Sequence, residues 1–344
     1  MRRFYRLVSW CLVVLSGMAG GSAMALQQPM QALTGYGSDQ FDHCSGSCSS
    51  RFDLEDVKSP ERISYFVPKV LKNGTSAPVI IYMHGFFAPV PEIYQDHIDH
   101  LTRQGNIVIF PQYHAAGWDL MKEMGVFAPA DQNEWLRHAV KATHHVLDVL
   151  GPMADRSEVY AFGHSIGGLL LLGWSHVGGP QLNGMLLANP KLDLKAGIPE
   201  FVHRFIHVKE LPWMDYAQSV RGRIMILGGQ DDYIALVSEL RAISHYITNA
   251  ASVVMYVAGS DHHNGDAVWA DHLAAASNSG MLKMFSWMRR GKSGGKIVLD
   301  TMDFRYYWAG LDALIDGKKE YNFDMGSWSD GVPFVKVTKA YQAN

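Results

Sequence analysis

The chain has little charge and little cysteine, and both shortages exclude classes of protein. Only 18% of its 344 residues are charged, the formal net charge is −3, and there are three cysteines. Intrinsically disordered chains combine low hydrophobicity with high net charge, which this composition does not. A near-neutral balance without a long basic run also argues against a nucleic-acid partner. We therefore expect a globular protein with a large core.

Motifs for nucleotide and zinc chemistry are missing as well. No G-x-G-x-x-G or Walker pattern follows an expected strand, and the chain has no H-E-x-x-H motif. The sixteen histidines include two close pairs, His97 with His100 and His144 with His145. We interpret these pairs as solvent-facing positions on helices, so the sequence predicts no metal and no cofactor.

One pronounced apolar run lies at the amino terminus. Three arginines in the first six residues precede a mostly apolar stretch over 7–19, and a small-x-small sequence ends at Ala25. These parts match a secretory signal peptide, so we predict that residues 1–25 are a signal cleaved after Ala25. The alternative is an uncleaved anchor, but the run is shorter than the roughly 20 residues that span a bilayer. We expect a secreted or periplasmic protein without a stable membrane span.

Cysteine usage suits an oxidising compartment. Cys11 leaves with the signal, and Cys44 and Cys48 remain as an even pair in a Gly- and Ser-rich segment. We predict a disulfide between them. The mature chain is expected to have three parts: an amino-terminal segment over 26–60 with the disulfide, a main domain over 61–290, and a carboxyl-terminal extension over 291–344 that packs on the domain.

Short β-branched runs alternate with segments of helical periodicity along the main domain. The expected strands are Ile63–Val67, Val79–Met83, Ile107–Phe110, Val159–Phe162, Met185–Ala188, Ile224–Leu227 and Val253–Val257. The expected helices are Ile93–Arg103, Asn133–Leu150 with Asp131 as N-cap, Gly168–His176 and Leu236–Thr248. Continuously apolar strands are typical of a sheet that is covered on both faces. The rhythm predicts an α/β fold with a doubly wound, mostly parallel sheet and helices on both faces.

The stretch over 190–221 is long for a connection between two strands. It is amphipathic and contains Phe201, Phe205, Trp213 and Tyr216. Two interpretations stay open, a small cap over the carboxyl edge of the sheet and an ordinary crossover helix.

The sequence GHSIG over 163–167 carries the strongest chemical signal. It follows an expected strand and precedes a helical run, which is the context of a nucleophile elbow. A sharp strand-to-helix turn holds its serine in strained backbone geometry, and small neighbours let the chain pass. Ser165 is therefore the candidate nucleophile.

An oxyanion hole needs two backbone N–H groups near that serine. One is expected from the residue after it, Ile166, and the other from the loop after an earlier strand. The strand over 79–83 ends in the sequence HGFF, so Phe86 is the candidate donor and Phe87 the alternate.

The acid should follow the strand over 224–227, at the carboxyl edge of the sheet. Asp232 is favoured because it lies in a G-x-x-x-D-x-I-A sequence, and Asp231 is the alternate in a G-x-x-D sequence. Asp193, after the preceding strand, is a weaker third candidate.

The base should follow the last strand. His262 lies three residues after Gly259, and His263 is the alternate one residue further on. An imidazole suits the task because its unperturbed pKa lies near 6.5. Asp261 and Asp266 could hold a metal together with the two histidines, but their position fits a base loop better.

With HGFF, GHSIGG, GGQDDYIA and GSDHH in this order and spacing, the chain resembles the α/β-hydrolase superfamily over roughly residues 63–289. Within it the chain is similar to the dienelactone-hydrolase, chlorophyllase and bacterial polyester-hydrolase neighbourhood. The similarity of GGQDDYIALV to the acid loop of polyester hydrolases implies Asp232 over Asp231. The resemblance also implies that the amides of Phe86 and Ile166 form the oxyanion hole. The chain departs from the polyester hydrolases at His164, where they usually have Trp.

These inferences predict a secreted serine hydrolase that cleaves carboxylic esters through an acyl-enzyme. Its expected triad is Ser165, His262 and Asp232, it requires no cofactor, and its substrate is a small-molecule, lipid or polyester ester. The alternatives are an acyltransferase or thioesterase with the same triad, and a catalytically silent binding protein on the same scaffold.

Overall fold

The structure, a computed structural model, describes most of the chain. The described residues are 27–54, 62–86, 88–115, 130–193, 195, 200–203, 207–277 and 299–343. The expected signal peptide over 1–25 and the alternate oxyanion donor Phe87 lie outside them.

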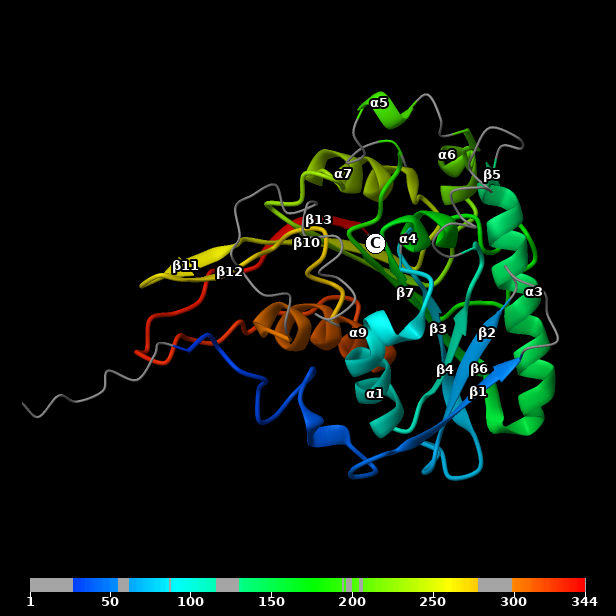
Figure 1. The fold of residues 1–344 in the computed structure, drawn as a ribbon, viewed down its shortest axis with the longest axis horizontal. Helices are drawn as coiled ribbons and strands as arrows, with labels where there is room; N and C mark the ends of the chain where they lie inside the picture. Colours follow the sequence, from blue (N-terminus) through cyan, green and yellow to red (C-terminus); the bar gives the residue numbers. More distant parts are fainter. Residues whose placement is uncertain are drawn as a thin grey trace, which may run out of the picture.

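A mixed sheet of nine strands forms the centre of the described chain (Figure 1). In order across the sheet, the strands are β1 (Ser49–Leu54), β2 (Ile63–Pro68), β4 (Ile107–Pro111), β3 (Ala77–Met83), β6 (Ala154–His164), β7 (Gly184–Ala188), β9 (Arg223–Gly229), β10 (Ser252–Ala258) and β13 (Thr338–Ala343). The six strands from β4 to β10 are parallel, while β1, β2 and β13 pair antiparallel. All seven strands expected from the sequence are present, and the predicted doubly wound, mostly parallel sheet is confirmed.

Helices cover both faces of the sheet. The α-helices in the described part of the chain are α1 (Gln95–Arg103), α3 (Gln132–Leu150), α4 (Ile166–Leu171), α5 (Glu200–His203), α6 (Trp213–Ala217), α7 (Val237–Tyr246) and α9 (Ala309–Ile315). Shorter turns are η1 (Asp39–Phe41), η2 (Pro91–Tyr94), η3 (Gly151–Met153) and the π-helical η5 (Asp303–Trp308).

Strand side chains divide between two cores because successive residues point to opposite faces. On β3, Val79 and Ile81 belong to the core shared with α3, α4 and α7, whereas Ile80 and Tyr82 belong to the core shared with α1, η5 and α9. Figure 1 shows α1 and α9 together on one side of the molecule and the long α3 on the other. A strand buried on both sides reads as an unbroken apolar run, which is why periodicity found these strands.

The long helix α3 begins as its sequence predicts. The Asp131 side chain accepts a hydrogen bond from the Asn133 N–H at 2.8 Å, which satisfies one of the free donors of the first turn. The interpretation of His97 and His100 as solvent-facing is wrong, since these side chains are 2% and 0% exposed beneath α9 and η5. The reason is that α1 is covered on this face by the carboxyl-terminal segment, which periodicity within α1 could not reveal.

Both segments that flank the expected main domain add a strand to the sheet. β1 pairs with β2 at one edge and β13 pairs with β10 at the other. The predicted disulfide Cys44–Cys48 is present and precedes β1. The described part of the carboxyl-terminal extension packs against the sheet, with Tyr306 and Leu311 both fully buried.

Among the described residues, two further pairs of short strands lie outside the main sheet. β5 (Ala130–Asp131) pairs with β8 (Val208–Lys209), and β11 (Asp261–His263) pairs with β12 (Asp266–Val268). β8 and the two short helices α5 and α6 belong to the stretch over 190–221, and Figure 1 shows these helices beside α7 at the top of the view. Within the described ranges, no helix combines the length and apolar character needed to cross a membrane.

Candidate active site

Ser165 occupies a sharp turn between β6 and α4. Its backbone has φ 57° and ψ −120°, a conformation that costs a non-glycine residue of order 1–3 kcal/mol. The turn needs small neighbours: an added Cβ at Gly163 would lie 2.8 Å from the Gly167 carbonyl oxygen, and one at Gly167 would lie 2.4 Å from the Met83 carbonyl oxygen. The amino end of α4 therefore lies close to the end of β3, and the strand-to-helix turn at Ser165 has the geometry of the predicted elbow.

Three side chains from three separate segments meet at this turn. The Ser165 Oγ lies 2.8 Å from the Nε2 of His272, and the His272 Nδ1 lies 2.8 Å from the Oδ2 of Asp232. The three residues are 3% to 6% exposed. The structure therefore joins Ser165 and Asp232 through a histidine that the sequence reasoning did not name.

The hydrogen bonds around Asp232 define the direction of this chain. Its Oδ1 accepts from the N–H groups of Ile234 and Ala235, each at 2.8 Å, so its Oδ2 is free to accept from the imidazole. An ionised carboxylate only accepts, which places the ring proton on the His272 Nδ1 and leaves the Nε2 lone pair facing the Ser165 hydroxyl.

The two other candidate acids lie away from the imidazole. Asp231 has an exposed side chain, and its backbone N–H donates to the Ala270 carbonyl at 3.2 Å. Asp193 accepts from the Lys195 N–H in a local turn.

The expectation that His262 or His263 contacts Ser165 is wrong. His262 is exposed on β11, with its ring 4.6 Å from that of Trp269. His263 binds Asp330, with 2.7 Å between its Nε2 and the Asp330 Oδ2.

The physical reason is the hairpin of β11 and β12. The chain leaves β10, runs out along β11, reverses at Asn264-Gly265 and returns along β12, so His272 is the histidine that reaches the edge of the sheet. Both turn residues have positive φ, 48° and 93°, as a two-residue type I′ turn requires. Asn-Gly is a strong hairpin signal. It is the feature of the sequence that indicates a hairpin at His262 and His263 and favours the next histidine, His272, as the one near Ser165.

The two expected oxyanion donors lie on the two segments that adjoin the turn at Ser165. Ile166 is the first residue of α4, and the first N–H groups of a helix have no acceptor within the helix. Phe86 follows Gly85, whose added Cβ would lie 3.0 Å from the His164 Nδ1, so the loop after β3 passes close to the elbow. Phe86 is 9% exposed, and its ring lies against His114 and Trp135.

Comparison with known proteins gives a fold. No protein-family model and no curated protein sequence matches the chain. Among solved structures, the chain is similar to the acylaminoacyl peptidase of Pyrococcus horikoshii, with a TM-score of 0.51, 13% identity, and coverage of 80% of this chain and 43% of the peptidase. An acylaminoacyl peptidase in complex with Z-Gly-Gly-Phe-chloromethyl ketone gives a TM-score of 0.50, 15% identity and the same two coverages. The esterase Pf2001 of Pyrococcus furiosus gives a TM-score of 0.48 and 16% identity, covering 77% of this chain and 95% of the esterase.

The two peptidase similarities, the nine-stranded sheet and the turn at Ser165 decide the architecture. The chain has the α/β-hydrolase fold. It spans less than half the length of the two peptidases.

Several histidines near the site of this α/β-hydrolase fold are buried and neutral. Burial lowers the pKa of His164 to about 3 and that of His114 to about 4, and it lowers the pKa of His84 well below its usual range. His84 donates from its Nδ1 to the Gly85 carbonyl at 2.9 Å. Because their pKa values are lowered, these rings stay neutral near pH 7 and serve as neutral hydrogen-bonding groups around the loop after β3.

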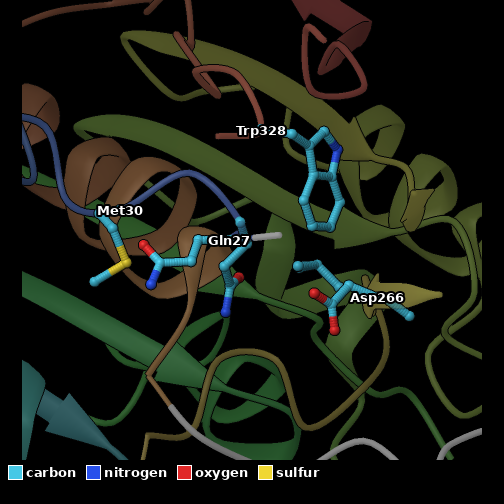
Figure 2. Close-up of a pocket in the computed structure, with 7 residues that line it drawn as sticks. Gln27, Met30, Asp266 and Trp328 are labelled. Atoms are coloured by element: carbon cyan, nitrogen blue, oxygen red, sulfur yellow. The ribbon is translucent and has the colours of Figure 1, made fainter. Parts of the chain in front are cut away.

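A separate cavity of about 280 Å³ lies between the amino-terminal segment and β12 (Figure 2). Figure 2 shows Gln27, Met30, Asp266 and Trp328 around it, and none of its lining residues belongs to the Ser165–His272–Asp232 chain. Among the residues that the structure describes, no three His, Cys, Asp or Glu side chains form a metal-binding group, and the four candidates of the β11–β12 hairpin do not converge.

Proposed function

We propose that the protein is a serine hydrolase in which Ser165, His272 and Asp232 act as a catalytic triad. The observation that carries this proposal is the unbroken hydrogen-bond chain from the Ser165 Oγ through both ring nitrogens of His272 to the Asp232 carboxylate, with 2.8 Å at each step. The strained backbone of Ser165 supports it, because strain of this kind persists where the surrounding structure imposes it and is concentrated at active sites.

The first half of the reaction forms an acyl-enzyme. The Ser165 Oγ attacks the acyl carbon while its proton passes to the His272 Nε2, and Asp232 stabilises the imidazolium that results. The amides of Ile166 and Phe86 donate to the oxyanion, and a single such donor contributes about 3 kcal/mol to lowering the barrier. The bond from carbon to the leaving group then breaks, and the leaving group takes the proton from His272.

Water completes the reaction. It attacks the acyl carbon, gives one proton to His272, and releases the acid as the Ser165 Oγ takes that proton back. No step requires a cofactor. The substrate we propose is a carboxylic ester, either a small molecule, a lipid or a polyester. Cleavage of a peptide or acylamino bond is the second candidate, and the similarity to the fold of acylaminoacyl peptidases supports it.

The decisive experiment is fluorophosphonate labelling together with hydrolysis of a chain-length series of p-nitrophenyl esters and the matching p-nitroanilides. We expect Ser165→Ala to lose labelling and His272→Ala to lower kcat by about 10⁴- to 10⁶-fold. His262→Ala is the matched control, since it removes an exposed imidazole from the neighbouring hairpin, and it should keep wild-type rates.

Each other outcome selects another function. No labelling of the folded wild type would leave a silent binding protein on a hydrolase scaffold. Hydrolysis of the p-nitroanilides that is lost in Ser165→Ala would select a peptidase. In the same assay with an added alcohol, partitioning of product toward that alcohol would select an acyltransferase, and with a thioester of matched acyl chain, faster hydrolysis than the ester would select a thioesterase. Equal losses in His262→Ala and His272→Ala would contradict the assignment of the base.

We also propose that the protein works outside the cytoplasm. The disulfide Cys44–Cys48 supports this location, because disulfides persist in oxidising compartments. Mass spectrometry of exported protein should find Leu26 as the first residue, and an intact amino terminus in that protein would refute the predicted cleavage.

A further inference from the structure

His164, the last residue of β6, lies between two loops of the proposed active site. Its Nε2 is 2.9 Å from the carbonyl oxygen of His272, and its Nδ1 is 2.8 Å from the hydroxyl of Tyr94. The same hydroxyl accepts from the Gly85 N–H at 2.9 Å. His164 is 3% exposed and Tyr94 is fully buried. A continuous chain of hydrogen bonds thus joins the loop after β3 to the backbone of the base.

The direction of every bond in this chain is determined. A carbonyl oxygen only accepts, so the His164 Nε2 carries the ring proton and donates to His272. Burial lowers the pKa of His164 to about 3, so its ring is neutral and its Nδ1 is an acceptor. The Tyr94 hydroxyl therefore donates to His164 while it accepts from Gly85, and all the polar atoms of the chain are satisfied.

The loop that carries His272 has no regular secondary structure of its own, and three successive carbonyls hold it. The carbonyls of residues 270, 271 and 272 accept, in that order, from the Asp231 N–H at 3.2 Å, the Asn189 Nδ2 at 3.1 Å and the His164 Nε2 at 2.9 Å. The donors come from the ends of β9, β7 and β6. His164 is also connected onward, through Tyr94, to the loop of the expected oxyanion donor.

The other end of the chain is equally tight. An added Cβ at Gly85 would lie 3.0 Å from the His164 Nδ1 and 3.3 Å from the Tyr94 hydroxyl oxygen. Gly85 directly precedes Phe86. The hydrogen bond from the Gly85 N–H to Tyr94 therefore orients the peptide group just before the expected oxyanion donor.

We propose that His164 is a positioning residue that, with Tyr94, couples the oxyanion loop at Gly85–Phe86 to the catalytic base His272. This inference rests on the proposed serine-hydrolase function. The coupling keeps the oxyanion donor and the His272 imidazole in register with Ser165, and a displacement of about 1 Å at a reacting group can lower a rate 10²-fold.

The test compares two buried tyrosines, of which only Tyr94 belongs to the hydrogen-bond series that links Gly85, His164 and His272. Tyr94→Phe removes one buried hydroxyl that bonds to the Nδ1 of His164. Tyr82→Phe is the matched control, because its hydroxyl is also fully buried and bonds to the Nδ1 of His97 at 2.9 Å, outside the triad loops. The readout is the second-order rate of labelling by a fluorophosphonate, in which the Ser165 Oγ–P bond forms, fluoride leaves and the proton passes to His272.

We expect Tyr94→Phe to label at least about tenfold more slowly than Tyr82→Phe at equal folded fraction, with an altered pH profile of labelling. Equal labelling rates and superimposable pH profiles in the two variants would overturn the proposal. The absence of labelling in wild type would instead refute the hydrolase function on which it rests, so the two failures are distinguishable.

Substitutions of His164 provide a rescue experiment. His164→Gln keeps an N–H donor for the His272 carbonyl, whereas His164→Leu has none. We expect the glutamine variant to label faster than the leucine variant by several-fold, and equal rates would contradict a positioning role. Should His164→Leu not fold, the comparison of the two tyrosine variants still decides.

Discussion

The buried pair of His100 and Asp312 should make the protein less stable as the pH rises into the alkaline range. The His100 Nε2 lies 3.0 Å from the Asp312 Oδ2, and the same oxygen accepts from the Gly37 N–H at 2.7 Å. Burial by itself lowers the pKa of His100, but the charge and hydrogen bonding of Asp312, together with the Asp39 carboxylate 3.9 Å from the His100 Nδ1, outweigh burial and raise the pKa to about 9. This pair ties the amino-terminal segment, α1 and α9 together.

The sign and size of the effect follow from the two pKa values. An unfolded histidine titrates near 6.5, so the stabilisation is fully present below that pH and is lost as the pH rises through about 9. At about 1.36 kcal/mol for each pH unit of difference, the loss amounts to about 3 kcal/mol. That is a large fraction of the 5–15 kcal/mol typical of a folded protein.

The other buried histidines produce the opposite slope on the acid side. The pKa values of His84, His97, His114 and His164 are all lowered by burial. Their unfolded forms take up protons below pH 6.5 while their folded forms do not, so stability falls as the pH decreases from about 6.5 toward 4. The free energy of unfolding should therefore be greatest near pH 6.5.

Urea unfolding followed by tryptophan fluorescence at pH 5, 6.5, 8 and 9.5 measures this curve. In wild type we expect a decrease of about 3 kcal/mol between pH 6.5 and 9.5. Asp312→Asn keeps an acceptor oxygen but loses the charge, so it should be less stable at pH 6.5 and lose most of the alkaline slope. Asp324→Asn, which removes an exposed carboxylate, is the charge control. Parallel curves for wild type and Asp312→Asn would refute the reasoning.

Three further changes test the elbow and the amino-terminal segment. Gly167→Ala brings a Cβ to within 2.4 Å of the Met83 carbonyl oxygen. We therefore expect a loss of about 1–3 kcal/mol in the free energy of unfolding and slower fluorophosphonate labelling. Wild-type stability would contradict this contact. In urea, the free energy of unfolding of Ser165→Gly should be about 1 kcal/mol higher than that of Ser165→Ala, because glycine adopts φ 57° without strain. A more stable alanine variant would contradict strain at this position. Replacing Cys44 and Cys48 by serine should cost at most about 2 kcal/mol and leave labelling unchanged, since the loop that they close is short; a slower labelling rate would link this segment to the site.

Local patterns in the sequence were sufficient for the main elements of the fold. The parallel strands are buried on both faces, so their apolar runs mark them without knowledge of their neighbours. The N-cap at Asp131 and the turn at Ser165 are likewise local, because each depends on residues within a few positions of it. Asp232 was favoured over Asp231 from the loop sequence, and in the structure it is the one bonded to an imidazole.

Contacts between distant segments required the tertiary structure. β13 joins β10 from the far end of the chain, and His100 is buried because α9 brings Asp312 to it. A short edge strand or a single helix face carries no local sign of such a partner.

The position of the proposed base also depends on the tertiary structure. The order Ser, Asp, His indicates that the segment after β10 supplies the imidazole. However, three histidines follow β10 within fourteen residues of its end: His262, His263 and His272. A two-residue turn at Asn264-Gly265 sends the first two outward and returns the third to Ser165. Amino-acid type and spacing therefore determined the proposed nucleophile and its strand, while the path of the backbone between β10 and the sheet edge determined that His272 is the histidine bonded to Ser165.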